Sequence, residues 1–347
     1  MDENEDVLVT TVNGVGLITL NRPKAINSLT HSMVTMIATA LKSWETDDTI
    51  EAVVVSGAGE RGLCAGGDVV AIYHDAKAGG SESRLFWHDE YLLNAYIGRY
   101  PKPYVAVMDG ITMGGGVGIS AHGSVRVVTD TTKMAMPEVG IGFIPDVGGT
   151  YILARSPGQL GTYAALTGAA FSGADAVAMG FADHYVPHER LGSFVETLVG
   201  EGVEAALTTH AEAPPPSPLQ AERQCIDSCY AGETVADIVA ALRDHDAPGA
   251  AKAADLISTR SPIALSVTLQ AVRRAAGLPT LEDVLVQEFR TSCAALRSHD
   301  LVEGIRAQLV DKDRNPQWVP PSLAAVTDAD VDAYFAPAQP DLTFEQE

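Results

Sequence analysis

The stretch "AMPEVGIGFIPDVGGTY", residues 135–151, contains two acidic residues, Glu138 and Asp146, and no other charged side chain. Burying a carboxylate among apolar groups is costly unless the carboxylate is paired or used. Each acid also has a purely structural interpretation. Glu138 can complement the dipole of a short helical turn after Pro137, and Asp146 can belong to the N-cap of a helix at "GGTYILARS" (148–156). The glycines at 140, 142, 148 and 149 and the proline at 145 argue against one continuous helix, so a turn can bring both carboxylates toward one cavity.

Two carboxylates that lie close together repel each other when both are ionised, so the pKa of one of them should rise. Glu138 and Asp146 then supply one ionised group and one proton donor near neutral pH. A third acid, Glu90, lies in the helix-like segment "FWHDEYLLNA" (86–95), in which Tyr91 and its apolar neighbours can face the core. Glu90 lies near the edge of that apolar face, and the alternative is that it belongs to a solvated helix face.

Two glycine-rich segments precede these acids. In "RGLCAGGDV" (61–69), two glycines before Asp68 let the backbone approach a ligand closely, and the alternative is a plain strand-to-helix turn that Asp68 caps. In "GITMGGGVGIS" (110–120), three consecutive glycines at the mouth of a helix present free N–H groups. The alternative for that segment is close packing of a helix against a sheet. If Gly67 and Gly115 face each other, their two N–H groups form an oxyanion hole.

The composition excludes several classes of protein. Of the 347 residues, 46% are hydrophobic and 20% are charged, as in a soluble globular enzyme, and the formal net charge is −22. Such a surface repels nucleic acids and anionic membranes, so we expect neither as a partner. A polyanionic small ligand therefore needs a local basic pocket. The sequence has no apolar run of about eighteen residues, so we expect no membrane span.

The four cysteines, at positions 64, 225, 229 and 293, are too few for a disulfide framework in a chain of this length. Cys225 and Cys229 are four residues apart and resemble a metal-binding pair, but no histidine or cysteine near them in the sequence completes a site. We therefore predict no metal. The N-terminal "MDENEDV" is acidic and polar, unlike a secretory signal or an Arg-rich transit peptide. Together these features predict a reducing cytoplasmic location.

Strands alternate with helices in the first half of the chain. Two β-strand patterns are separated by Asn13 and Gly14, which is a strong hairpin signal. Apolar residues recur at helical spacing after residue 31, where Thr30 or Ser32 can cap the helix. This alternation favours a layered α/β fold in which several loops converge at strand ends. We expect strands at 7–12, 15–20, 52–57, 104–110 and 125–130, and helices from about 31 and over about 82–98.

The second half is mostly helical. Its clearest linker candidate is the Pro-rich "AEAPPPSPLQAE" (211–222), and amphipathic helical patterns follow it. We therefore expect a core over residues 1–200 and a mostly helical C-terminal region over residues 201–347.

Several motifs resemble those of the crotonase (enoyl-CoA hydratase/isomerase) superfamily, in the order expected for it. They are "LNRPKAINSL" (20–29), "CAGGD" (64–68) and the segments at 110–120 and 135–151. The resemblance implies a crotonase-like spiral of repeated ββα units and an acyl-CoA substrate, with no other cofactor. It assigns the oxyanion-binding N–H groups to Gly67 and Gly115. It places the CoA nucleotide near Lys24, Ala25 and Ile26, and the pantetheine arm along Ala65, Gly66 and Asp68.

The sequence departs from enoyl-CoA hydratases at one position. Those enzymes use two glutamates; Glu138 matches the second, whereas the first falls on Gly118, which has no side chain. The added Asp146, the string "EYLLN" (90–94) and the C-terminal "EFRTSCAALRSHDLVEGIRAQLVDKDRNPQW" are similar to those of 3-hydroxyisobutyryl-CoA hydrolases, which are thioesterases of valine breakdown. That resemblance makes Glu138 the catalytic glutamate and Asp146 its partner. It assigns Glu90 to the acyl pocket, where it accepts a hydrogen bond from the substrate 3-hydroxyl.

The resemblance leaves two chemical routes open. Glu138 either attacks the thioester carbonyl or activates water as a general base, while Asp146 transfers a proton or positions water. Two other functions compete with hydrolysis: an isomerase or hydratase reaction of the same superfamily, and acyl-CoA binding without catalysis. Because members of the superfamily often form trimers or hexamers, we also expect a homo-oligomer, with the C-terminal helices making contacts between subunits and covering the site.

Overall fold

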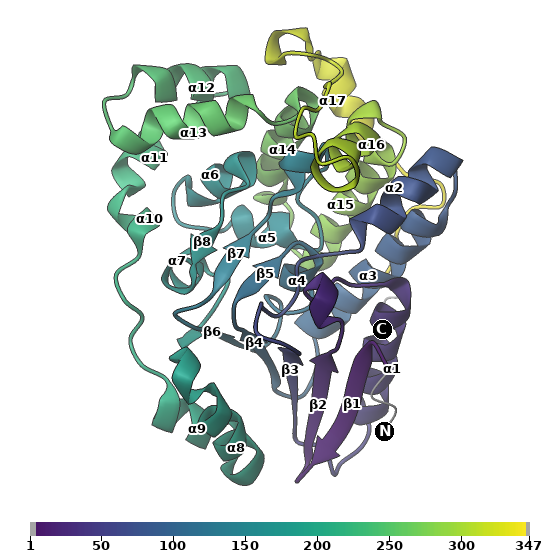
Figure 1. The fold of residues 1–347 in the computed structure, drawn as a ribbon, viewed down its shortest axis with the longest axis vertical. Coiled ribbons are helices and arrows are strands. Elements are labelled where there is room, and N and C mark those ends of the chain that lie inside the picture. The colour runs from purple at the N-terminus through teal and green to yellow at the C-terminus, as the bar shows by residue number, and fades with distance from the viewer. Residues whose placement is uncertain (1–4, 345–347) are drawn as a thin grey trace. The chain divides into compact units, whose positions relative to one another are not determined.

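A computed structural model describes residues 5–344 as a mixture of strands and helices, which confirms the predicted α/β class (Figure 1). Backbone contacts group these residues into two compact units. Unit 1 comprises residues 5–67, 92–135 and 171–220, and unit 2 comprises residues 68–91, 136–170 and 221–344. This grouping differs from a division at residue 200, because two earlier segments of unit 2 pack with its C-terminal helices. The boundary between 1–200 and 201–347 itself stays a prediction.

Unit 1 carries the β-sheets of the described chain. The larger sheet has the order β1-β2-β3-β4-β6-β9, and all neighbours except β1 and β2 are parallel. The smaller sheet has the order β5-β7-β8, in which β5 and β7 are parallel. The strands are β1 (Val7–Val12), β2 (Val15–Leu20), β3 (Ala52–Gly57), β4 (Tyr104–Met108), β5 (Ile111–Met113), β6 (Val125–Val128), β7 (Lys133–Ala135), β8 (Phe171–Ser172) and β9 (His184–Tyr185).

The hairpin between β1 and β2 forms as the sequence predicts. Asn13 and Gly14 both have positive φ, 47° and 79°, which suits the tight turn that matches the twist of paired strands. The turn sets the register, in which Val12 pairs with Val15.

Helix α1 (His31–Glu45) covers part of the larger sheet. Thr30 caps its start by accepting a hydrogen bond from the Met33 N–H at 3.3 Å. The helix packs against β2 through Trp44, which is buried. Gly16 of β2 makes room for the indole ring, because a Cβ at that position would lie 2.6 Å from it. A local cap and a missing side chain together determine how this helix docks.

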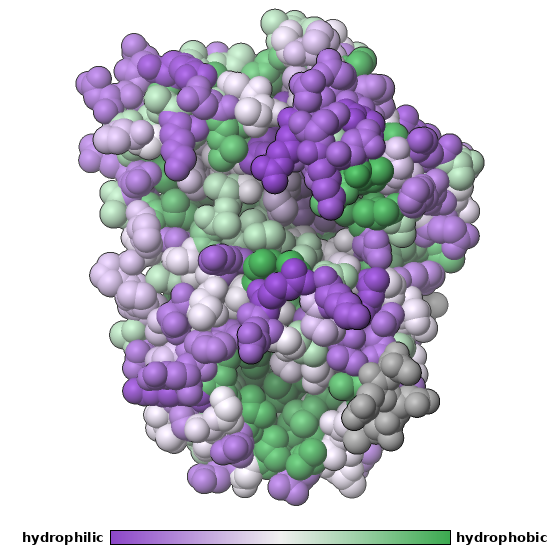
Figure 2. Space-filling model, viewed as in Figure 1, coloured by the Kyte–Doolittle hydropathy of each residue, from purple (hydrophilic) through white to green (hydrophobic). Residues whose placement is uncertain are grey.

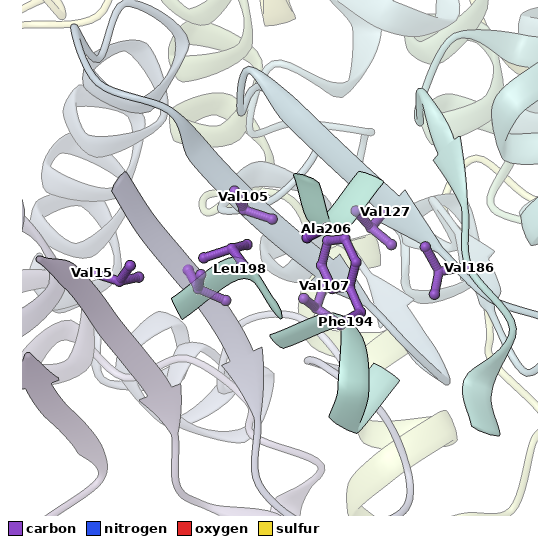
Figure 3. Packing of buried hydrophobic residues seen from close by; sticks show 9 residues of the cluster. Val15, Val105, Val107, Val127, Val186, Phe194, Leu198 and Ala206 are labelled. Atoms are coloured by element: carbon purple, nitrogen blue, oxygen red, sulfur yellow. The ribbon is translucent and has the colours of Figure 1, made fainter. Parts of the chain in front are cut away.

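Apolar side chains join the sheet of unit 1 to two of its later helices. Figure 3 shows Phe194 and Leu198 of α8 (Leu191–Glu201) packed on the strand residues Val105 and Val107, and Ala206 of α9 (Val203–His210) belongs to the same cluster. Partly buried hydrophobic residues surround this cluster, and apolar side chains also gather on the visible face of unit 1 (Figure 2). Burying each large apolar side chain stabilises the fold by about 1.5–3 kcal/mol.

The remaining helices of unit 1 are short. They are η1 (Pro23–Ala25), α4 (Gly115–Gly118), α7 (Gly173–Met179) and η3 (His188–Arg190). Helix α10 (Pro218–Ala221) and the long helix α3 (Glu82–Gly98) each contribute residues to both units.

Unit 2 is helical. Figure 1 shows α12 and α13 side by side, joined to the preceding α11. The helices are α2 (Val69–Ala78), η2 (Glu138–Ile141), α5 (Gly149–Leu153), α6 (Leu160–Thr167), α11 (Arg223–Cys229), α12 (Val235–Asp244), α13 (Pro248–Ser258), α14 (Pro262–Ala275), α15 (Leu281–Ala295), α16 (His299–Ile305), η4 (Arg306–Val310), η5 (Leu323–Ala325) and α17 (Asp328–Tyr334).

The predicted helical character of the second half is confirmed, because no strand follows β9 in the chain as described to residue 344. Two strands are shorter than expected: β4 ends at Met108 and β6 at Val128, each two residues before the predicted end. Within residues 5–344, no helix combines the length and the apolar character that crossing a membrane requires.

Candidate active site

Four buried carboxyl groups interact electrostatically within unit 2. Glu90 lies on α3, Glu138 begins η2, Asp146 lies in the loop before α5, and Glu288 lies on α15. Their exposed fractions are only 2%, 6%, 5% and 0%. Burial of acids in such number without a cation is costly, so these groups share protons or act on a bound molecule. We call them the acid cluster.

Asp146 is held by a tyrosine hydroxyl. The Tyr91 Oη donates to Asp146 Oδ2 at 2.6 Å and also lies 2.7 Å from Ser292 Oγ. Asp146 is not the N-cap of α5, because Gly148 occupies that position. The interpretation of Asp146 as a capping residue is therefore wrong. Val147, between Asp146 and Gly148, has a φ of 54°, which a β-branched residue rarely adopts. This φ marks local backbone strain of the kind found at functional sites.

Glu288 fastens the loop that carries Asp146. Its Oε2 accepts the Gly148 N–H at 2.6 Å. Its Oε1 accepts both the N–H and the hydroxyl of Thr150, at 2.9 and 2.5 Å. Sequence reasoning missed this residue. One signal could have found it. Glu288 lies one helical turn from Val284 and one turn from Ser292, both of which are buried, so helical periodicity places this acid on a buried face.

The acid cluster has strongly perturbed pKa values. Burial raises the pKa of Asp146 from 3.8 to about 7, against the lowering effect of the Tyr91 hydrogen bond. Burial, and then the charge of Asp146, hold the pKa of Glu138 and of Glu90 well above the usual range. Burial raises the pKa of Glu288 to about 8, opposed by its hydrogen bonds from Thr150 and Gly148. Asp146 therefore ionises at a lower pH than Glu138, which keeps its proton near neutral pH.

Two oxygens of the acid cluster have no hydrogen-bond partner in the described part of the chain. They are Glu90 Oε1 and Glu138 Oε2, both fully enclosed by protein. A native fold rarely leaves such atoms unsatisfied without a functional reason. Glu138 does start a short helical turn, as its structural interpretation predicted, but the turn does not use this oxygen. Both groups remain able to bond a ligand.

The glycine loops that were predicted to bind an oxyanion lie together in unit 1. Cys64 N–H donates to Ile111 O at 3.1 Å, and Met113 N–H donates to Cys64 O at 2.9 Å, so the two loops run side by side. A Cβ on Gly66 would lie only 3.8 Å from the Gly115 nitrogen. Among the backbone hydrogen bonds of the described loops, none uses the N–H of Gly67 or Gly115 as its donor.

The residues predicted to contact CoA also meet in unit 1, except Asp68. Lys24 and Ala25 are exposed on η1, and Ile26 accepts the Ala65 N–H at 2.9 Å beside Gly66. The Arg61 guanidinium donates to Lys24 O at 2.6 Å and so adds a second positive charge that the sequence did not single out.

Asp68 belongs to unit 2, where it caps α2 by accepting the Ala71 N–H at 3.4 Å, as its structural interpretation predicted. Gly118 lies within α4 of unit 1 and is buried, so the hydratase acid has no counterpart there.

The sequence argument against a metal near Cys225 and Cys229 fails. It held that no histidine completes the pair, but His245 lies close to both in unit 2. The ligand atoms of the three residues all lie within 4.8 Å of one another. The histidine comes from the far end of α12, which brings it back to the cysteines on α11.

Comparison with known proteins relates most of the chain to one family. Residues 15–335 match the family model described as enoyl-CoA hydratase/isomerase. The chain is 42% identical to the mitochondrial 3-hydroxyisobutyryl-CoA hydrolase of Danio rerio over 342 residues, covering 95% of this chain and 89% of the relative. It is 39% identical to the Homo sapiens enzyme of the same name over 345 residues, covering 96% and 89%.

Two solved structures share the fold over nearly their full length. A crystal structure described as a carnitinyl-CoA dehydratase from Mycobacterium thermoresistibile is 71% identical, with a TM-score of 0.97 and coverage of 99% of this chain and 100% of that one. An enoyl-CoA hydratase from Rhodobacter sphaeroides is 40% identical, with a TM-score of 0.93 and coverage of 98% and 100%. The predicted crotonase fold is confirmed.

The prediction of a cytoplasmic location is wrong by these comparisons, because the curated relatives are named as mitochondrial proteins. The prediction relied on an acidic N-terminus and on too few cysteines for a disulfide framework. Free cysteines distinguish a reducing from an oxidising compartment, and they do not tell one reducing compartment from another.

Proposed function

The chain belongs to the enoyl-CoA hydratase/isomerase family, and from this premise we propose that it hydrolyses 3-hydroxyisobutyryl-CoA, or a close 3-hydroxyacyl-CoA, to the free acid and CoA. The observation that carries the proposal is the pair of Glu138 and Asp146, buried in unit 2 with Asp146 held by Tyr91. Curated relatives that match this chain over nearly all of its length are named as such hydrolases. CoA is part of the substrate, so no separate cofactor is required.

The backbone N–H groups of Gly67 and Gly115 hold the thioester oxygen as negative charge develops on it. Preorganised donors of this kind are usually the largest contribution to catalysis of acyl transfer. Support comes from unit 1, where the two glycine loops run side by side and leave these N–H groups out of the backbone hydrogen bonds of the described loops.

Glu138 and Asp146 supply the proton chemistry of the same step. Because the pKa of Asp146 is about 7 while that of Glu138 is held well above its usual range, Asp146 is the group that ionises first. Asp146 takes the proton from Glu138, and Glu138 then either attacks the carbonyl carbon to form an anhydride or takes a proton from the attacking water. On either route the C–S bond breaks and the CoA sulfur takes the proton held by Asp146. On the first route water then hydrolyses the anhydride and returns a proton to Glu138, so both routes consume one water for each thioester cleaved.

Glu90 gives selectivity for the 3-hydroxyl group. Its Oε1 is buried and has no partner among the described residues, and its pKa is raised by burial and then by Asp146. A substrate hydroxyl satisfies this oxygen, whereas an unsubstituted acyl chain leaves it unpaired. A site built to bond a hydroxyl discriminates strongly against analogues that lack it.

Dehydration or hydration is the competing function, favoured by the solved structure at 71% identity that is described as a carnitinyl-CoA dehydratase. That chemistry changes the Cα–Cβ bond and leaves the thioester intact. The absence of a side chain at Gly118 removes one of the two acids that hydratases use. The acid cluster supplies Asp146 instead, which supports hydrolysis.

A thioesterase panel tests the proposal. Purified protein is given 3-hydroxyisobutyryl-CoA, 3-hydroxypropionyl-CoA, butyryl-CoA and crotonyl-CoA, and free thiol and remaining thioester are measured separately. Thiol release from the 3-hydroxyacyl thioesters, lost in Glu138→Gln, is expected. A changed acyl group with CoA still attached would establish the dehydratase reaction instead, and tight binding without turnover would establish a non-catalytic role.

The proposed reaction also implies a metabolic pathway. Hydrolysis of 3-hydroxyisobutyryl-CoA is a step of valine degradation, and we propose that the protein acts there.

We also propose a homo-oligomer in which the helical region over residues 201–347 makes contacts between subunits and covers the site over residues 1–200. Light scattering of the full chain and of its complex with CoA checks this arrangement, and a monomer under both conditions would contradict it.

A further inference from the structure

Three potential metal ligands meet in unit 2, on elements that carry none of the acid cluster. Cys225 and Cys229 lie on α11, one turn apart and therefore on one face. His245 directly follows α12. All three ligand atoms lie within 4.8 Å of one another.

The spacing suits a tetrahedral ion. With zinc–sulfur bonds of about 2.3 Å and zinc–nitrogen bonds of about 2.0–2.1 Å, tetrahedral angles separate the sulfur from the nitrogen by about 3.6 Å. Cys225 Sγ lies 3.6 Å from His245 Nδ1. Both cysteines are free thiols, and thiolate and imidazole together favour zinc over magnesium or calcium. Three protein ligands leave a fourth position for water.

The loop after α12 already holds the imidazole in place. The Ala247 N–H donates to His245 Nδ1 at 3.0 Å. Coordination through Nδ1 displaces this hydrogen bond, and because His245 is exposed, water can take up the released N–H. Cys229 is buried, Cys225 is half-buried and His245 is exposed, so an ion can enter from solvent. The net charge of −22 also favours cations near the surface.

We propose that Cys225, Cys229 and His245 bind one zinc-type divalent cation, which fastens α11 to the loop between α12 and α13. The ion is structural, since it lies on none of the elements that carry Glu138 or Asp146. Binding releases the two thiol protons and leaves the ion bonded to two thiolates, the imidazole and water. This proposal does not depend on the proposed hydrolase activity.

Cobalt binding tests the proposal on the full chain, reduced with a phosphine that does not bind metal. Co²⁺ should produce a thiolate-to-metal charge-transfer band that saturates at one ion per chain and disappears when Zn²⁺ is added. Cys225→Ser and His245→Ala should each abolish or strongly weaken the band. Cys293→Ala, which removes a buried thiol on α15, should keep it.

Thermal unfolding separates loss of the site from loss of the fold. Zn²⁺ should raise the Tm of the native protein and of Cys293→Ala, because an ion that binds only the folded state stabilises it. His245→Ala should unfold at the same Tm with and without Zn²⁺. The proposal is overturned if no charge-transfer band forms or if the band survives in both ligand variants.

Discussion

Replacing Tyr91 with phenylalanine removes the hydroxyl that donates to Asp146 at 2.6 Å while keeping the buried ring. A hydrogen bond to an ionised group is worth about 1.5–3 kcal/mol, and each pKa unit corresponds to about 1.36 kcal/mol. The pKa of Asp146, raised by burial to about 7, should therefore rise further in Tyr91→Phe. The expected increase is about one to two units.

The sign of the effect follows from the proposed role of Asp146 as the proton acceptor. The proposed mechanism requires ionised Asp146, so kcat/KM of the native protein should rise with pH through about 7. In Tyr91→Phe the same limb should move to about pH 8–9, which lowers the rate at neutral pH by about five- to fiftyfold. The other ionisable groups that influence Asp146, namely Glu90, Glu138 and Glu288, are unchanged.

The assay is CoA-thiol release over a range from about pH 5.5 to about pH 9.5. The matched control is Tyr96→Phe on the same helix, because the Tyr96 hydroxyl donates to Glu45 at 2.8 Å and not to the acid cluster. The control should leave the limb near pH 7. If Tyr91→Phe is active and its limb coincides with that of the native protein, Tyr91 does not tune the proton acceptor and the reasoning is refuted.

Four further changes test other parts of the site. Glu138→Gln should lower kcat by at least about a hundredfold at unchanged Tm, as loss of a general base does, and near-native thiol release would disprove its role. Glu288→Gln turns an amide N–H₂ toward a backbone donor and should lower the free energy of unfolding by about 1–3 kcal/mol, measured in urea against Glu282→Gln on the same helix. The pKa of Glu288 is about 8 in the folded protein, above its ordinary value of 4.5. The contribution of protonated Glu288 to stability is therefore fully present below about pH 4.5 and is lost as pH rises through about 8. The Tm of the native protein should fall over that pH range. Glu90→Leu should lower kcat/KM for 3-hydroxyacyl-CoA about tenfold or more and leave butyryl-CoA hydrolysis unchanged, and an equal loss for both substrates would contradict a contact with the hydroxyl. Lys24→Ala should raise KM about two- to fivefold at constant kcat and make KM less dependent on salt concentration. A Lys42→Ala control should change neither KM nor its salt dependence.

Short-range patterns predicted the local structure well. The hairpin at Asn13 and Gly14, the helix that Thr30 caps and the helix over residues 82–98 all form where the sequence placed them. Each depends on turn conformation, capping or side-chain periodicity, which are properties of neighbouring residues. Local reasoning also offered a helix cap as the alternative for Asp146, and that alternative is wrong, because Gly148 takes the N-cap position.

By itself, the sequence determined the family and predicted a set of reacting groups. Its ordered motifs pointed to one superfamily, and Gly118 with Asp146 pointed to a hydrolase rather than a hydratase. Only the tertiary structure decided which side chains control those groups. Tyr91 is 55 residues from Asp146, and Glu288 is 140 residues from the Gly148 N–H that it binds.

The same holds for His245, 20 residues after Cys225. The sequence places it outside any local metal motif, and folding of α12 back along α11 brings it within reach. Periodicity and capping act between residues a few positions apart, so a sequence displays them directly. The partners of a buried carboxylate or a thiol come from whichever distant segments pack against it, and hydrophobic packing of the whole unit makes that choice.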